Sequence, residues 1–261
     1  MPVTPDAGRP GWSLLSAVDG TPLARFRPRD DDGRPVAAEL RPLPGADPVD
    51  VAARARHDLA GQRLETPVDA VTDALVAGGL TLRRAATELR HDLVDLPEVL
   101  PLPAGWSLTA AGWDDDLAAA LTAAYGPGHP DGGWTPEDTR QVRAMVDGTD
   151  PLPPLGSASA VLTGDDGRSY GHVLCAGPVP WVEDGGAWIL NIAVAPQAQG
   201  RGLGRALLTH ALHGTRDAGL PTLGLSVADG NPARRLYDRA GFRPSARVLS
   251  VLLPPRAEPV G

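Results

Sequence analysis

The feature that most constrains the fold is a cluster of three glycines between a strand-like and a helix-like segment. Gly200, Gly202 and Gly204 follow the apolar run LNIAVAP, and residues 202–218 have the apolar period of a helix. Glycine tolerates positive φ and the close approach of a ligand, and a helix N-terminus attracts anions. The pattern therefore predicts an α/β domain whose glycine loop offers backbone N–H groups to an anion.

Two common kinds of glycine loop do not fit this spacing. A P-loop needs a lysine followed by serine or threonine after its second glycine, and all 24 residues counted as Lys or Arg are arginines. A dinucleotide fingerprint needs a third glycine three residues beyond Gly204, where Leu207 stands. The first kind of site is excluded and the second is disfavoured.

The segments around the loop predict a mixed sheet. We expect strands in GWSLTAA, in the hairpin of SASAVLTG and RSYGHVLCAG, and in the run that ends at Pro196. Helices are expected after Asp114 and from Thr135 to Val146, because each begins with a capping residue. A further strand, helix and strand are expected over residues 222–228, 232–240 and 246–253. The fold class is therefore α/β, in an α+β arrangement whose central, largely antiparallel sheet is flanked by helices.

A proline-rich segment divides the chain. LPEVLPLPAG, at residues 96–105, is typical of a linker, so we expect a small α/β domain over residues 1–97 and a larger domain over residues 98–261. The smaller domain is expected to hold a hairpin turn at Asp19-Gly20, two helices and a strand. Its passage ALVAGGLTLRRAATELRHDL resembles RLYDRAGFRPSARVLSVLLP near the C-terminus, and whether this is a true repeat stays open.

Composition excludes several partners. The formal charge of −8 at pH 7 argues against nucleic acid, because phosphate backbones bind basic surfaces. The apolar runs are short and interrupted, so no membrane span is expected, and the polar start MPVTPDAGRPGW predicts a cytoplasmic protein. Cys175 is the single cysteine, which leaves no internal disulfide, and no metal site is expected.

The glycine loop at residues 199–204 fits the pattern Q/R-x-x-G-x-G/A. The later segment from Asn231 to Phe242 is similar to the pattern N-x-x-A-x-x-L-Y-x-x-x-G-F, with Ala233 one position early. In this order, the two motifs resemble the signatures of the GNAT superfamily of acyl-CoA-dependent N-acetyltransferases. The resemblance covers about residues 105–254, and it implies the GNAT fold with acetyl-CoA as the co-substrate.

The resemblance also implies roles at the acyl donor. Tyr237 is expected to give a proton to the leaving CoA thiolate, although a core tyrosine beside Leu236 and Phe242 is the alternative from the residues alone. The residues expected to hold the CoA pyrophosphate and pantetheine are Ile192, Ala193, Val194, Gln199, Gly200, Arg201, Gly202, Leu203, Gly204, Arg205, Asn231 and Arg234.

The motifs say less about the acceptor. Family members often use a glutamate on or beside the strand before the glycine loop to deprotonate the amine, and here that strand carries no acid. Glu183, His172 and an ordered water are the open alternatives. The loop between the first two helices of the larger domain is expected to form the acceptor site through Tyr125, His129, Asp131 and Trp134.

The expected activity is acetyl transfer to a primary amine of a small molecule by direct attack. Two alternatives stay open: a non-catalytic acyl-CoA-binding sensor or scaffold, and a tandem enzyme similar to mycothiol synthase, made of two GNAT modules. Residues 1–97 contain no Q-x-x-G-x-G, so an N-terminal module would be truncated and unable to bind CoA in this way. It would instead shape the acceptor site or an oligomer interface, and a homodimer is one of the expectations.

Overall fold

The structure is a computed structural model that divides into two compact units. It describes residues 3–31, 33–150, 152 and 154–256. Unit 1 consists of the described parts of Met1–Thr87 and Ala246–Gly261, and unit 2 is made by Glu88–Ser245. Two strands, β6 (Leu82–His91) and β12 (Arg243–Leu252), contribute residues to both units. The division therefore differs from the boundary expected at residues 97–98.

Unit 1 is a sheet with two helices packed on one face. Its strands follow the order β1–β2–β3–β4–β5–β12, and α1 and α2 pack against each other and cover its apolar core. Asp47 caps α1, because its side chain accepts a hydrogen bond from Val49 N. The bounds are β1 Val3–Pro5, β2 Ser13–Ser16, β3 Pro22–Asp31, β4 Arg34–Pro42, α1 Pro48–Asp58, β5 Arg63–Thr66 and α2 Asp69–Ala77.

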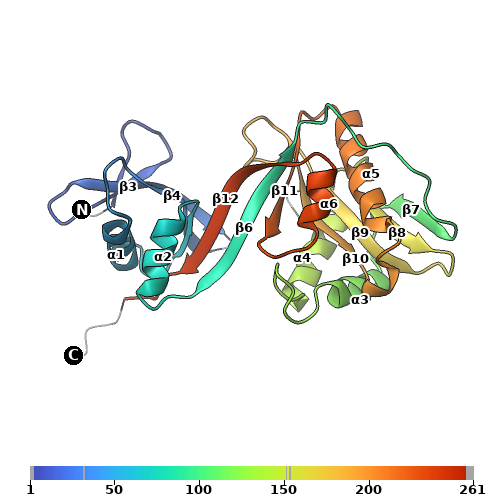
Figure 1. Ribbon diagram of the computed structural model, residues 1–261, viewed down its shortest axis with the longest axis horizontal. Helices are drawn as coiled ribbons and strands as arrows, with labels where there is room; N and C mark the ends of the chain where they lie inside the picture. Colours follow the sequence, from blue (N-terminus) through green and yellow to red (C-terminus); the bar gives the residue numbers. More distant parts are fainter. Residues whose placement is uncertain (1–2, 32, 151, 153, 257–261) are drawn as a thin grey trace. The chain divides into compact units, whose positions relative to one another are not determined.

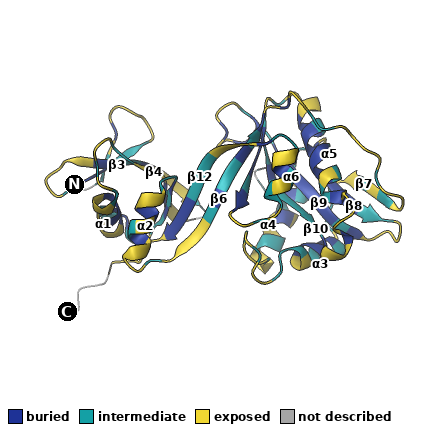
Figure 2. Cartoon of the chain, viewed as in Figure 1, coloured by how far each residue is buried: buried dark blue, intermediate teal, exposed yellow. Residues whose placement is uncertain are grey.

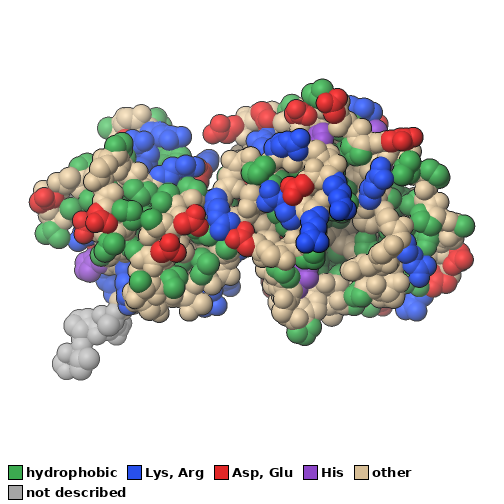
Figure 3. Space-filling view, viewed as in Figure 1, with side chains coloured by type: hydrophobic (Ala, Val, Ile, Leu, Met, Phe, Trp, Pro, Cys, Tyr) green, Lys and Arg blue, Asp and Glu red, His purple; other side chains and the backbone are tan. Residues whose placement is uncertain are grey.

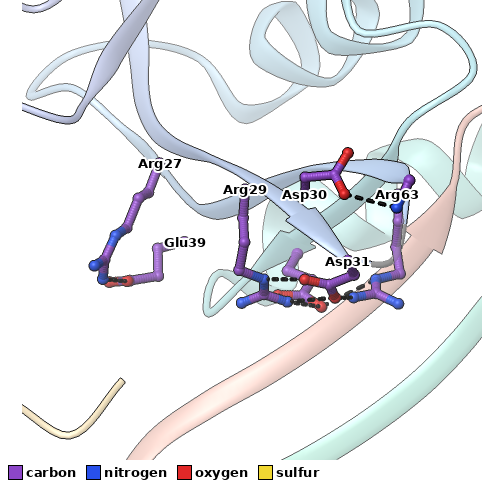
Figure 4. Close-up of polar contacts among 8 residues, drawn as sticks. Arg27, Arg29, Asp30, Asp31, Glu39 and Arg63 are labelled. Carbon is purple, nitrogen blue, oxygen red and sulfur yellow. Dashed lines mark hydrogen bonds and ion pairs between the residues drawn. The ribbon is translucent and has the colours of Figure 1, made fainter. Parts of the chain in front are cut away.

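Charged side chains lie on unit 1 strands away from this core. In β5 the buried Leu64 alternates with Arg63 and Glu65, which therefore point to the other face. Figure 4 shows Arg63 with Arg29 and Asp31 of β3. Together with Glu65 these side chains form a closed ring of ion pairs. Arg29 Nε lies 2.6 Å from Asp31 Oδ1, and Arg29 Nη2 lies 3.1 Å from Glu65 Oε2. Since β3 and β5 flank β4, the ring bridges this strand on the face that the helices leave uncovered.

Unit 2 has helices on both faces of its strands. Alternating residues of β9 contact different clusters: Val173 and Cys175 pack with α5, whereas Leu174 packs with Val142 and Met145 of α4. Alternate strand residues point to opposite faces, so α5 covers one face and α3 and α4 the other (Figure 1). The bounds are β7 Trp106–Ala110, α3 Asp115–Ala124, α4 Pro136–Val146, β8 Ala160–Gly164, β9 Ser169–Ala176, β10 Ala187–Val194, a 3₁₀ turn Pro196–Ala198, α5 Leu203–Asp217, β11 Leu223–Ala228 and α6 Arg234–Arg239.

The sequence signals that predicted unit 2 correspond to observed contacts. Asp114 accepts a hydrogen bond from Leu117 N and starts α3, and Thr135 forms a capping box with Asp138 at the start of α4. The apolar stripe of α5 is buried, as the dark blue residues of Figure 2 show. No helix of the described ranges has the length and apolar character to cross a bilayer. The expected mixed sheet flanked by helices is confirmed.

The two units repeat one order of elements. In unit 1, β3 pairs antiparallel with β4, which crosses through α1 to the parallel strand β5, and α2 and β6 follow. In unit 2, β9 pairs antiparallel with β10, which crosses through α5 to the parallel strand β11, and α6 and β12 follow. The helix–glycine–strand resemblance in the sequence is the last part of this repeat. Strands β4 and β5 did not emerge from the sequence, because β4 begins and ends near prolines and β5 is very short.

Candidate functional site

Strands β10 and β11 separate soon after they begin. Their parallel register joins Ala187 and Trp188 to Leu223 and Gly224. Beyond these pairs β10 keeps its antiparallel partner β9 as far as Val194, whereas its register with β11 does not continue within the described residues. A gap between two strands offers unpaired backbone groups to an extended ligand.

The backbone groups that face this gap belong to the residues expected to hold the pantetheine. Ala195 N donates to Tyr170 O on the β9 side. Successive strand residues direct their N–H and C=O groups to alternate sides, so Ile192 and Val194 direct theirs toward β11. Gln199 Nε2 donates to Val194 O at 2.9 Å, which ties the glycine loop to the end of β10.

The glycine loop has the backbone that its sequence predicts. Gly200 and Gly202 have φ of 76° and 79°, a region that side chains with a Cβ rarely adopt. The first three residues of α5, 203–205, have N–H groups without an intrahelical acceptor, and the helix dipole makes this end attractive to an anion. At Gly204 an added Cβ would lie 3.7 Å from Leu236, an ordinary contact. The loop therefore needs glycine most at positions 200 and 202.

A β-bulge in β10 brings a polar side chain to the face covered by α3 and α4. The register with β9 shifts between Ile189 and Asn191, so the consecutive residues Leu190 and Asn191 both lie on this face. Asn191 Nδ2 donates to the Tyr125 hydroxyl at 3.0 Å, and His172 Nε2 lies 2.7 Å from Asn191 Oδ1. An amide oxygen only accepts, so His172 donates through Nε2 as a neutral ring.

His172 is fully buried, and burial lowers its pKa to about 4 although its bond to Asn191 acts the other way. In the unfolded chain His172 is protonated below about pH 6.5, whereas in the folded protein it stays neutral until the pH falls to about 4. Between these two pH values the unfolded state therefore binds one more proton than the folded state. We therefore expect His172 to cost the protein about 3 kcal/mol of stability as pH falls through this window.

The measurement is urea unfolding at pH 7 and pH 4.5 for the wild type and His172→Gln. Glutamine keeps an N–H donor for Asn191 but does not titrate. The wild type should lose more stability than the variant between the two pH values. An equal loss in both proteins would show that His172 is not held neutral by burial.

Tyr237 is buried in the main core of unit 2. Its side chain is 6% exposed, and its ring meets that of Phe242 edge to face, with centroids 6.0 Å apart. Burial raises the pKa of its phenol well above the usual value, and the neighbouring Tyr125 and Asp131 raise it further. Tyr237 therefore stays protonated at neutral pH, which is the state that a proton donor needs.

The loop between α3 and α4, residues 125–134, forms an aromatic wall beside Tyr237. The Tyr125 ring lies 4.7 Å from that of His129 and 5.3 Å from that of Trp134. Trp134 N donates to Tyr125 O and closes the loop. The carboxylate of Asp131 accepts hydrogen bonds from Ala228 N, at 3.0 Å, and from Asn231 Nδ2. The expected acceptor residues are thus brought together with Asn231 and Tyr237.

Arginines gather at the start of α5 and along α6 in a chain whose net charge is negative. Figure 3 shows basic side chains over α6, beside a hollow in the surface. Arg234 is paired with Asp238 at 2.8 Å, and Arg201 lies with its guanidinium 5.9 Å from the Trp106 ring centroid. Arg201, Arg205 and Arg235 are exposed, so this end of α5 combines free helix N–H groups with positive charge.

Glu183 is not brought to this site. It is exposed in the turn before β10, whereas the glycine loop follows the last residue of that strand. Eight extended residues separate these ends, a span of about 26 Å. Its neighbour Asp184 accepts hydrogen bonds from Arg90, at 2.7 Å, and from Thr222. This turn therefore helps to hold the N-terminal ends of β10 and β11.

His91, near the end of β6, supports the helix that carries Tyr237 and was missed in the sequence. It is 3% exposed; its Nδ1 accepts from Leu93 N and its Nε2 donates to Ala240 O at 3.0 Å. At Gly241, where φ is 98°, an added Cβ would lie 2.8 Å from His91 Nε2. The glycine of the second motif is therefore needed both for its backbone and for His91. The polar setting of His91 in RHDL gave no signal of this contact.

The thiol of the single cysteine is not available at the site. Cys175 is fully buried in the core, and burial raises the pKa of its thiol, so it stays protonated. Within the described part of the chain, no group of three or more His, Cys, Asp or Glu side chains could hold a metal ion.

Comparisons with known proteins agree with the motifs. The model of the Acetyltransferase (GNAT) family matches residues 116–242. A mycothiol acetyltransferase of Tsukamurella paurometabola is 34% identical over 257 residues, which are 95% of this chain and 80% of the relative. A mycothiol acetyltransferase of Actinosynnema mirum is 32% identical over 270 residues, covering 90% of this chain and 82% of the relative. In fold, the chain is similar to a GCN5-related N-acetyltransferase from Sphaerobacter thermophilus, with a TM-score of 0.62 and 17% identity over 95% of this chain and 82% of that one.

Proposed function

The chain belongs to the GNAT acetyltransferase family, and on that premise we propose that it transfers the acetyl group of acetyl-CoA to a primary amine of a small molecule. The observation that carries the proposal is the gap between β10 and β11, with the glycine loop at its end and Tyr237 beside it. The gap fits an extended pantetheine arm, and the start of α5 fits a pyrophosphate.

The residues that would hold acetyl-CoA are those that the resemblance named. Ile192 and Val194 would pair with the pantetheine amides, and the backbone of residues 199–205 would bind the pyrophosphate. Asn231 keeps a second N–H on its amide nitrogen beside the one given to Asp131, so it can donate to the pantetheine as well. Arg201, Arg205 and Arg234 would add charge-assisted contacts to phosphates.

In the reaction that we propose, a bond forms between the amine nitrogen and the acetyl carbon while the bond from that carbon to sulfur breaks. The electron pair goes to sulfur, and Tyr237 protonates the thiolate. The amine must lose its own proton, and we propose that water takes it. Glu183 lies at the far end of β10, and the buried His172 already donates to Asn191.

The relatives' name suggests the first acceptor to test, which is mycothiol lacking its acetyl group. The experiment incubates the protein and acetyl-CoA with this compound, an aminoglycoside and simple primary amines, and detects N-acetyl products by mass spectrometry. We expect one acceptor to be acetylated far faster than the rest. Acetyl-CoA binding in a calorimeter without product from any amine would favour a binding-only module.

A further inference from the structure

Asp131 connects two segments that form different walls of the site. It lies in the loop of residues 125–134, and its Oδ1 accepts from Ala228 N at 3.0 Å while its Oδ2 accepts from Asn231 Nδ2. Ala228 ends β11, and Asn231 lies in the turn that leads to α6 and Tyr237. One carboxylate thus joins the aromatic loop to the turn of the second motif, about a hundred residues away in sequence.

The partners of Asp131 are themselves held in place. Asn231 Oδ1 accepts from Ala233 N at 2.8 Å, so both ends of its amide are bonded. Asp131 N donates to His129 Nδ1 at 3.2 Å, and the loop is closed at its base by Trp134 N and Tyr125 O. Because each carboxylate oxygen of Asp131 accepts from a protein donor, this side chain is built to join two segments rather than to present a free charge.

We propose that Asp131 is a positioning residue. Its contact with Asn231 holds the aromatic loop of residues 125–134 in place and also fixes the orientation of the Asn231 side chain. The proposal rests on the function proposed above, in which Asn231 donates to the pantetheine. It makes the two substrate sites interdependent: loss of the contact should weaken acetyl-CoA binding as well as acceptor binding. A carboxylate that only attracted the acceptor's ammonium group would affect the acceptor alone.

Exchanging the residues at positions 131 and 231 separates the effect of their mutual hydrogen bond from the effect of each side chain alone. In Asp131→Asn, the new amide can still accept from Ala228 N, but its NH₂ faces the NH₂ of Asn231. In Asn231→Asp, two carboxylates face each other and repel unless they share a proton. In the double variant D131N/N231D, Asn at 131 accepts from Ala228 N and donates to Asp at 231, which accepts from Ala233 N. The three protein hydrogen bonds are then restored, and donor and acceptor are exchanged only between positions 131 and 231. The side chain at position 231 no longer has an N–H for the pantetheine.

The readouts are the Kd of acetyl-CoA by calorimetry, the KM of the acceptor, kcat and the melting temperature. We expect Asp131→Asn to raise both the Kd and the acceptor KM about tenfold or more. Asn231→Asp should bind acetyl-CoA more tightly as pH falls and the two carboxylates share a proton. The double variant should return the acceptor KM to within about threefold of the wild type and should restore the melting temperature. Its acetyl-CoA Kd should stay raised, because aspartate at position 231 has no N–H to give the pantetheine.

Glu137→Gln is the matched control, because it removes a carboxylate from the same region of the chain. Glu137 is exposed, and among the described residues its ion-pair partner is Arg140. The control variant should leave every readout unchanged.

Three outcomes would overturn the proposal. Asp131→Asn could leave the binding of both substrates as in the wild type, or it could weaken acceptor binding alone while the acetyl-CoA Kd stays fixed. The double variant could also fail to recover the acceptor KM and the melting temperature. The calorimetric series needs no turnover, so it tests Asp131 even if the wild type acetylates no amine. Turnover by the wild type with a flat Kd series would leave the proposed function standing and remove the role of Asp131.

Discussion

Replacing Tyr237 by phenylalanine is expected to lower kcat between about a hundredfold and ten-thousandfold, the usual contribution of a positioned general acid. The substitution removes the phenol oxygen and keeps the ring that packs against Phe242. The loss should therefore appear in kcat, while the Kd of acetyl-CoA stays within about threefold. Steady-state kinetics with saturating acetyl-CoA, together with calorimetry, measure the two quantities separately.

The pH dependence gives a second test of the same role. Burial raises the pKa of Tyr237 above its usual value, so the phenol keeps its proton throughout the neutral range and loses it only in strong base. The wild type should therefore keep its Tyr237-dependent rate up to the usual tyrosine pKa of about 10. A loss of that rate below pH 10 that Tyr237→Phe lacks would contradict the buried, protonated state. Tyr170→Phe is the matched control, because that phenol donates to Asp166 in a surface turn. Unchanged kcat in Tyr237→Phe would leave Tyr237 as a core tyrosine.

The conformation of the glycine loop and the start of α5 could be predicted because their determinants are close together in sequence. The positive φ of Gly200 and Gly202 follows from the choice of glycine, and the start of α5 follows from the apolar period after it. Asn231 and Tyr237 lie in one short segment, so local structure alone brings these two side chains close to each other. The expected helices and the mixed sheet were confirmed for the same reason.

The acceptor side depends on contacts that sequence spacing does not reveal. Asn191 lies in an apolar strand, and only the bulge turns its side chain to the face of His172 and Tyr125. A regular strand would have directed it to the α5 face. Asp131 was expected to meet the acceptor, whereas its carboxylate bonds the turn before α6. Such contacts arise when two loops meet at the end of a sheet, and the sequence of one loop does not indicate which residues of the other loop it will contact.

Because unit 1 repeats the element order of unit 2, comparing the two units shows what the glycine loop adds to the shared topology. In unit 1 residues 43–47 join β4 to α1, whereas in unit 2 residues 195–202 join β10 to α5. The shorter connection has one positive-φ glycine, Gly45, and follows Pro42, which has no N–H to offer a ligand. The repeated topology therefore lacks the loop that would hold a pyrophosphate in unit 1.

Valine at both Gly200 and Gly202 is accordingly expected to weaken acetyl-CoA binding between about thirtyfold and a thousandfold. Each position has a φ near 80°, which costs a β-branched residue about 1–2 kcal/mol, and the two costs fall on the bound conformation of the loop. Calorimetry should show one acetyl-CoA per wild-type chain and no residual tight site in the double variant. Gly45→Val imposes the same backbone conflict on the connection of unit 1 and should leave the Kd unchanged. A second equivalent of acetyl-CoA, or binding that survives in the double variant, would show that the unit 1 topology suffices without the longer loop.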